Sequence, residues 1–355
     1  MNFQRESTTF IILFSLFNNV IAQSNEEDFA SLNYSGTIYN RGSSAAAFLE
    51  IGAGSRAIAL GGAYAASADD VTCMYWNPAG LGWIKKAGIS VNHANWLAET
   101  NFEYFAIAIP LNDQNVIGIN LTVLDYIKNQ PVRTIIQPEG TGEFYGASDM
   151  ALGLTYSKIL YDRFSFGITA KYIRQEIWHE KALGYAMDLG IHYKTRLDGL
   201  AIGSSISNFG GELKLGGRDL LRAFDDDQLN YSNDKLNVQH TTDSFPLPLI
   251  IRSGISYNKK LFLNSSVTCM VDLIHPSNNI ETLNAGIEFT FLRYLSLRAG
   301  YQSLFDDSSE SGLSLGVGVL SKSKGNFPLG IHYTYSVWGI LNDVHRFSID
   351  WSIAN

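Results

Sequence analysis

The sequence predicts an all-β protein: a 14-stranded antiparallel transmembrane β-barrel with an N-terminal hatch inside the lumen. Three observations support this fold class. From Ala87 onward, segments of about ten residues alternate apolar and polar side chains and end in turn residues. Charged residues make up 17% of the chain, well below the roughly 25% of an average soluble domain. Beyond the N-terminus, no apolar run reaches the ~18 residues that a membrane helix needs.

Composition also narrows the functional classes. The chain has 26 Lys and Arg against 34 Asp and Glu, a net charge of −8, with no basic patch to follow a phosphate backbone. Nucleic-acid binding is therefore disfavoured. The 32 Gly, 18 Tyr and 20 Phe make the chain rich in glycine and aromatic residues. The two remaining classes are a large soluble β protein and a transmembrane barrel.

The N-terminus indicates export. Residues 1–22 have the pattern of a secretory signal peptide, with Arg5 near the start, an apolar stretch and a cleavage site ending at Ala22. No Cys follows that site to carry a lipid anchor, so we expect an unlipidated chain beginning near Gln23. Residues 23–47 are polar and predict a periplasmic tail. Cys73 and Cys269 are too few for a disulfide framework.

Fourteen segments show the strand pattern, and an even number suits a single-chain bacterial barrel with both ends on one side. The clearest alternation runs through 182–194 and 344–354. The predicted strands are 87–95, 102–110, 115–126, 147–158, 163–175, 182–194, 199–208, 247–258, 261–273, 281–291, 295–302, 312–320, 326–337 and 344–354.

The polar face of these strands distinguishes a barrel from a sandwich. It is small, glycine-rich and sparsely charged, which suits a crowded lumen, whereas a sandwich surface would carry many Lys and Glu. Its ionisable residues are Lys171, Asp188, His192, Arg252, Asp272, Glu288, Arg298, His332, Arg346 and Asp350. The opposite face is almost free of charge, since Lys or Arg facing lipid at mid-bilayer costs about 2–4 kcal/mol. Aromatic residues near strand ends there, such as Tyr126 and Tyr172, predict interfacial girdles.

Connection lengths agree with a barrel in the outer membrane, where short periplasmic turns alternate with longer external loops. The predicted inner turns are 111–114, 159–162, 195–198, 259–260, 292–294 and 321–325. The predicted outer connections are 96–101, 127–146, 176–181, 209–246, 274–280, 303–311 and 338–343, each longer than any inner turn.

Residues 48–86 do not alternate like a strand and contain many glycines and small residues, which predicts a compact hatch inside the lumen, followed by the barrel over 87–355. We expect Arg56, Asp69 and Asp70 to find partners among the lumen charges. The predicted network that holds the hatch comprises Lys171, Asp188, Arg252, Glu288, Arg298 and Asp350.

The hatch also carries a family resemblance. The runs 48–57, 60–63 and 75–81, together with Asp69-Asp70, resemble the opening of the PorV/PorQ family, which belongs to the FadL-like outer-membrane barrels. The motif residues are Arg56, Gly61, Gly62, Asp69, Asp70, Asn77 and Pro78. The resemblance implies a role in type IX secretion: receiving cargo proteins by their C-terminal signal domains from the translocon and passing them to the surface attachment machinery. Cys73 departs from the family pattern, which usually has a small residue there.

Enzymatic motifs are matched only superficially. Gly52-x-Gly54-x-x-Ala57 lacks the βαβ unit of a dinucleotide site. Residues 312–316 match Gly-x-Ser-x-Gly but lie within an alternating strand rather than a strand–turn–helix elbow. The histidines have no metal-ligand spacing, and the run 225–227 of three Asp lacks a full calcium pattern. We therefore expect no catalysis, no cofactor and no resident metal.

Apolar residues in the outer connections predict a protein-binding surface, with a cap over the barrel mouth as the equally weighted alternative. The candidate partner-binding residues are Trp96, Trp178, Leu220, Leu221, Phe224, Tyr231 and Trp338.

Two functions remain open at this point. The first is the cargo-binding role in type IX secretion, and the second is FadL-like transport of hydrophobic small molecules across the outer membrane. A transporter should have an apolar pocket at the external mouth beside a kinked strand or lateral opening. A cargo carrier should have a closed lumen and an exposed apolar rim.

Overall fold

The computed structural model describes residues 42–224, 236–306, 309–321 and 328–353. The predicted signal peptide (1–22), the tail as far as residue 41, Asp225–Asp227 and Tyr231 lie outside these ranges. Within them, no helix is both long and apolar enough to cross a bilayer.

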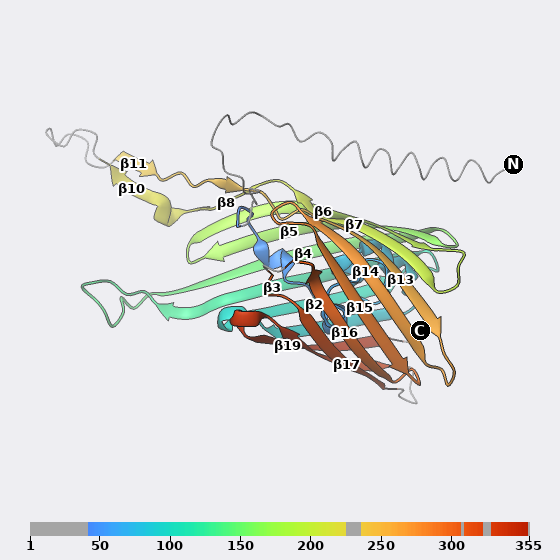
Figure 1. The fold of residues 1–355 in the computed structure, drawn as a ribbon. Helices are drawn as coiled ribbons and strands as arrows, with labels where there is room; N and C mark the ends of the chain where they lie inside the picture. The colour runs from blue at the N-terminus through green and yellow to red at the C-terminus, as the bar shows by residue number, and fades with distance from the viewer. Residues whose placement is uncertain (1–41, 225–235, 307–308, 322–327, 354–355) are drawn as a thin grey trace, which may run out of the picture. The chain divides into compact units, whose positions relative to one another are not determined.

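Fourteen antiparallel strands close into a barrel, as predicted (Figure 1). Each pairs with its neighbour in sequence, β1 pairs with β19 to close the ring, and β7 pairs with β13 across an external insertion. The barrel strands are β1 Ala87–Asn95, β2 Asn101–Pro110, β3 Asn115–Pro131, β4 Phe144–Tyr161, β5 Phe164–Ile177, β6 Glu180–Lys194, β7 Leu200–Gly210, β13 Ile250–Lys260, β14 Ser266–Pro276, β15 Thr282–Phe291, β16 Leu295–Leu304, β17 Leu313–Ser321, β18 Leu329–Val337 and β19 Asp343–Ile353.

The shorter elements form the hatch and the connections. The hatch elements are η1 Ala47–Glu50, α2 Ser55–Ala59, α3 Cys73–Trp76 and η2 Pro78–Trp83. The connections contain η3 Leu97–Glu99, β8 Leu213–Lys214, β9 Gly216–Gly217, η4 Arg218–Leu220, β10 Leu221–Phe224, β11 Leu236–Gln239, β12 Ser244–Phe245 and η5 Gly339–Leu341.

The strand alternation places apolar side chains outward. Leu154, Ile287, Leu297, Leu315 and many similar residues are exposed on the outer wall, while their neighbours are buried inside. A water-facing wall of this kind would be unstable, so the barrel spans a membrane. Cys269 is exposed on this wall and Cys73 is buried in the hatch, both as free thiols.

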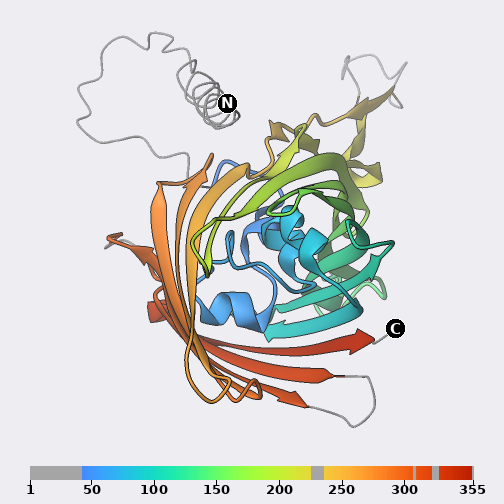
Figure 2. The same cartoon turned by 90° about the vertical axis from the view of Figure 1, so that its right-hand side faces the viewer.

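The lumen is filled by the hatch, which Figure 2 shows within the ring of strands. Its small and apolar side chains, among them Phe48, Leu60, Tyr64 and Met74, form the core together with inward residues of the wall such as Tyr104. The lumen is thus a packed interior rather than an open pore.

Several strand limits differ from the sequence prediction. β13 and β14 begin at Ile250 and Ser266 rather than 247 and 261. The run Leu261-Phe262-Leu263 continues the apolar pattern but forms a turn, in which Leu263 has φ 56°. The outer connection predicted at 176–181 is reduced to residues 178–179, because the β5–β6 ladder continues to Ile177 and Glu180. That connection is therefore shorter than the inner turn 261–265. The outer connections 96–100, 277–281 and 338–342 only equal that turn, so the prediction that every outer connection is longer than any inner turn is wrong.

The structure describes residues 42–47 of the predicted periplasmic tail, and they do not lie at the periplasmic end. The backbone N–H of Ala45 donates to the carbonyl of Pro246 at 2.9 Å, and the amide of Asn278 donates to the hydroxyl of Ser44 at 2.7 Å. Both partners lie in connections at the end predicted to face outward. Residues 42–47 therefore lie at the outer end and belong to the hatch. From there the chain crosses the lumen to the start of β1 at the inner end.

Candidate functional site

The glycines of the hatch motif are explained by close backbone contact with the wall. Gly61 has φ +67°, and a Cβ on it would lie 2.6 Å from the backbone nitrogen of Tyr301. Gly300 faces it from β16, where a Cβ would lie 2.0 Å from the nitrogen of Gly61. Gly62 also has positive φ, +72°. Only glycine permits this approach between the hatch and the wall.

Asn77 and Pro78 join the end of the hatch to the opposite wall. The Asn77 side chain accepts from the Ala79 N–H, capping η2. Its amide donates to the carbonyls of Ala65 at 2.7 Å and Ile191 at 3.0 Å. Pro78 packs where Gly167 leaves space, since a Cβ there would lie 2.2 Å from the Pro78 carbonyl carbon. These motif residues therefore have a structural function.

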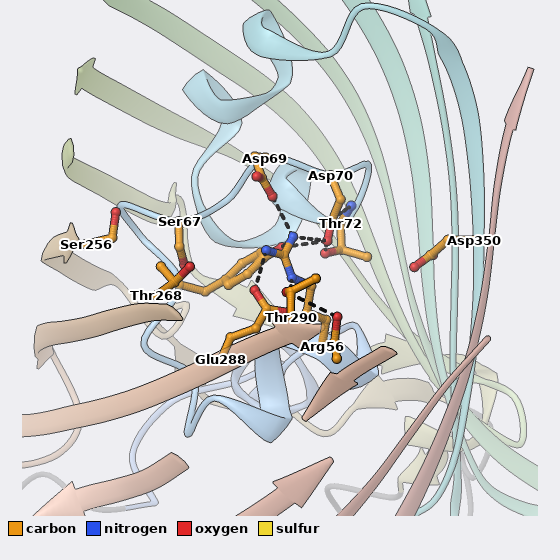
Figure 3. A network of polar contacts seen from close by, with 12 residues as sticks. Arg56, Ser67, Asp69, Asp70, Thr72, Ser256, Thr268, Glu288, Thr290 and Asp350 are labelled. Atoms are coloured by element: carbon orange, nitrogen blue, oxygen red, sulfur yellow. Dashed lines mark hydrogen bonds and ion pairs between the residues drawn. The ribbon is translucent and has the colours of Figure 1, made fainter. Parts of the chain in front are cut away.

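Arg56 is the centre of an ionic cluster that we call the clasp (Figure 3). Its guanidinium lies 2.5 Å from Asp69, 3.2 Å from Asp70 and 2.9 Å from Glu288 on β15. It also donates to the Tyr64 hydroxyl at 3.1 Å, and that hydroxyl donates to Asp70 at 2.5 Å. The clasp, Arg56, Tyr64, Asp69, Asp70 and Glu288, links two segments of the hatch to one strand of the wall.

The clasp continues along the wall as a chain of contacts. Arg298 lies 2.7 Å from Glu288 and donates to His332 at 3.1 Å. His332 lies 3.1 Å from Asp350 on β19. Three of the predicted lumen residues, Glu288, Arg298 and Asp350, are therefore joined.

The other three predicted lumen residues lie apart from that chain. Lys171 and Asp188 form a buried ion pair at 2.6 Å. Arg252 donates to Ser207 at 3.0 Å and lies over the ring of Trp76. The prediction of a single network is therefore wrong: two buried groups and a separate arginine contact hold different sides of the lumen.

An apolar pocket of about 890 Å³ opens at the outer end of the lumen. Its apolar lining comes from the hatch, β3, β4, β5, β6 and the external insertion. These lining residues are Ala45, Tyr126, Ala147, Ile177, Ala182, Leu213, Leu215 and Phe245. The lining also has polar residues, among them Asp149, which accepts hydrogen bonds of 2.8 Å from Tyr126 and Gln175.

The barrel wall is irregular around this pocket. The β3–β4 register shifts between Asp125 and Ile127. Tyr126 has the inward parity of the buried Thr122 and Leu124 and donates to Asp149 in the pocket, so its placement in the lipid girdle was wrong. The β6–β7 register shifts between Met187 and Leu189, and Asn208 beside it has φ 64°. Beyond that shift β7 ends, and Leu213 of the insertion packs over Gly184 of β6.

The inner end has a different chemistry. A cavity of about 470 Å³ there is lined by charged and hydroxyl side chains, including Arg56, Asp69 and Thr268. Lys194 lies 3.6 Å from the centre of the Trp83 ring, and the Trp83 indole donates to His192 at 3.0 Å.

The candidate partner-binding residues fall into two groups. Trp96 and Trp338 pack edge to face at 5.0 Å, and Trp178 stacks on His179 at 4.3 Å. Leu220 is partly buried, whereas Leu221 and Phe224 are exposed on β10. The tryptophans thus pack against neighbours, and only the β10 residues present free apolar surface.

Sequence reasoning missed several site residues. Tyr64 is an aromatic of the hatch whose hydroxyl role has no sequence signal. Asp149 has the inward parity of β4, which could have placed it in the lumen set. Ile135 and Ile136, almost fully exposed at the tip of the β3–β4 connection, stand out as adjacent apolar residues in a polar loop.

Comparison with known proteins identifies the fold. No family model and no curated protein matches the chain. The solved CymD monoaromatic hydrocarbon channel superposes with a TM-score of 0.56 over 86% of this chain and 98% of its own, at 11% identity. The toluene transporter TbuX of Ralstonia pickettii gives 0.52 over 85% and 97%, at 13% identity. The toluene transporter TodX of Pseudomonas putida gives 0.51 over 85% and 96%, at 12% identity.

The chain has the barrel fold of these channels and transporters. With its even strand number and apolar wall, it is an integral protein of the bacterial outer membrane. At these identities the likeness establishes the fold, and function is argued from the site.

Proposed function

We propose that the protein is an outer-membrane channel that takes up hydrophobic small molecules. The observation that carries this proposal is the apolar pocket of about 890 Å³ at the outer mouth. Pockets of this size and lining bury most of a small apolar ligand. Polar side chains of the same lining, Asp149 and Gln175 among them, would orient a ligand that has one polar end.

The surroundings of the pocket support transport rather than simple storage. Its walls include Gly42, Ser44 and Ala45 of the hatch, so a bound ligand would contact the hatch directly. The register shifts in β3 and β6 lie beside it, where the wall has fewer ladder hydrogen bonds to hold it rigid. The similar structures bear the names of hydrocarbon channels, which agrees with the apolar lining.

The test is uptake of labelled toluene and oleate by host cells that lack related channels and express the full chain. Ala182→Trp fills the pocket with an indole and should reduce uptake to the host background. Ile340→Trp adds the same group at the exposed rim, outside the pocket, and should leave uptake unchanged. Heat-modifiable migration confirms that each variant is folded. Equal uptake by both variants, or none by the native chain, would contradict the proposal.

A second candidate, the type IX cargo role, is favoured by exposed apolar side chains on the outer connections. Ile135, Ile136, Phe305 and Ile340 are 102, 91, 92 and 85% exposed. Side chains of this kind suit a protein partner. Purification of the tagged protein from its native host should then recover exported proteins that share a C-terminal domain, and Ile135→Ser with Ile136→Ser should reduce their yield. Recovery of bound lipid without protein would contradict this role.

A further inference from the structure

The short-turn end of the barrel carries a ring of basic side chains, which we call the collar. It comprises Lys86, Lys158, Arg163, Lys259, Lys260 and Arg293. Only Asp113, Asp162 and Asp198 oppose them in the described turns of that end. At the opposite end the balance is reversed, with carboxylates such as Glu139, Glu143, Glu212, Asp243, Glu310 and Asp343 in the connections.

The collar is available for an external partner. Lys86, Arg163, Lys259, Lys260 and Arg293 are exposed and Lys158 is half-buried. None of the six takes part in the ion pairs that the structure shows among described residues. Their charge is therefore not neutralised within the described part of the chain.

The distribution of the collar indicates what it faces. Lys86 precedes β1, Arg163 joins β4 to β5, Lys260 ends β13 and Arg293 joins β15 to β16. These positions are spread around the ring of strands rather than gathered on one side. A protein partner docking from one direction would use a patch, whereas a lipid leaflet surrounds the barrel and meets every strand end.

Exposed apolar side chains lie beside the basic residues of the collar in the same turns. Phe262 is 83% exposed two residues after Lys260, Tyr161 is 76% exposed two residues before Arg163, and Leu292 and Tyr294 flank Arg293. The Leu261 N–H donates to the Ser265 carbonyl at 2.8 Å and closes this turn, which holds the aromatic ring of Phe262 at the tip of the turn. A base beside an exposed aromatic suits the bilayer interface, where the ring enters the headgroup layer and the cation remains at phosphate level.

We propose that the collar is a binding site for the phosphate groups of anionic phospholipids in the leaflet that faces the short turns. In an outer-membrane barrel the short turns face the periplasm, so this is the inner leaflet. Basic residues near a membrane surface attract anionic headgroups, and the attraction weakens as salt screens it. This inference does not depend on what the channel transports.

The experiment is native mass spectrometry of the full chain released from mixed micelles containing equal amounts of phosphatidylglycerol and phosphatidylcholine. The native protein should retain phosphatidylglycerol preferentially, and added salt should reduce the preference. The variant Arg163→Gln, Lys259→Gln, Lys260→Gln, Arg293→Gln should lower that preference about tenfold. The matched control removes four bases from the acidic end, Lys128→Gln, Arg133→Gln, Lys214→Gln, Arg222→Gln, and should retain the preference.

Equal retention of both lipids by the native protein overturns the proposal, as does an equal loss in the control variant. Collar-dependent binding of soluble polyglutamate without a lipid preference also overturns it, by assigning the collar to an acidic polymer. Heat-modifiable migration checks that the fourfold variant is folded, and the pair Lys259→Gln, Lys260→Gln serves in its place if it is not.

Discussion

The hatch is held differently at the two ends of the lumen. At the inner end the clasp holds Arg56 against Glu288 of the wall and two carboxylates of the hatch. At the outer end residues 44–46 make neutral hydrogen bonds to Asn278, Pro246 and Gln175, beside the apolar pocket. Further along the hatch, Arg346 of β19 donates to the carbonyls of Gly52 and Ile51. The comparison indicates that ion pairs hold the hatch at the inner end, whereas hydrogen bonds hold it at the outer end, beside space for a ligand.

Removing the clasp should have the largest effect. Arg56→Met leaves Asp69 and Asp70 without their cation and Glu288 with Arg298 alone. Breaking a buried ion pair costs about 3–5 kcal/mol, and because Asp69 is largely exposed we expect the lower end of that range. We expect the hatch to leave its seat. Cys73 reports this, because burial raises the pKa of its thiol and only an accessible thiolate reacts quickly. In a Cys269→Ser background, Arg56→Met should therefore increase maleimide labelling of Cys73.

The control for the clasp is Lys85→Met, which removes an exposed cation of the hatch at the same end. Lys85 donates to the carbonyl of Asp113, outside the clasp. Labelling of Cys73 should remain at the native level in this variant. An unlabelled Cys73 in Arg56→Met would show that neutral packing alone holds the inner end.

A smaller loss should follow from Gly61→Ala. The added Cβ meets the Tyr301 backbone and requires φ +67° of a non-glycine residue, which costs of order 1–3 kcal/mol. The thermal midpoint should fall, as measured by the loss of heat-modifiable migration. Gly211→Ala, where nothing lies within 4 Å of a Cβ, should leave the midpoint unchanged, and an equal fall in both would contradict the close-approach argument.

The sequence predicted the barrel well because period-two alternation is local and recurs in every strand. The same parity placed Lys171, Glu288 and Arg298 inside, where they are buried. Parity could not show how these groups pair, because pairing depends on strand register and, for Glu288 and Arg56, on a contact between segments far apart in sequence. Lys171 meets Asp188 across the β5–β6 hairpin once its register is set, whereas Glu288 meets Arg56 only when the hatch is inserted.

Other predictions were wrong at the ends of strands. Tyr126 was assigned to the lipid girdle as an aromatic residue near a strand end, although it shares the inward parity of the buried Thr122 and Leu124. The turn at Leu261-Phe262-Leu263 was predicted as strand because its residues are apolar. The path of residues 42–47 had no sequence signal, because polar composition does not tell which end of a barrel a segment occupies.

The outer end should tolerate loss of single contacts better than the clasp. Trp96→Ala removes an edge-to-face pair with Trp338, and such a pair contributes about 0.5–1.5 kcal/mol beyond the burial of its area. A double-mutant cycle with Trp338→Ala, followed by thermal unfolding, measures this coupling. A coupling of zero would mean that the two rings pack independently and leave the rim without a cap.

The smallest effect is expected from removing the β10–β11 hairpin, whose strands are largely exposed. The His240 N–H already donates to the Leu220 carbonyl at 2.9 Å, so Gly-Gly can replace residues 221–239 without moving either flank. Exposed residues of this kind change stability by no more than about 0.5 kcal/mol, and thermal unfolding should confirm it. Toluene uptake should persist, since Leu213 and Leu215 remain to line the pocket. A variant that folds but loses uptake would show that the hairpin shapes the pocket, and one that fails to fold would make it part of the barrel's structural cap.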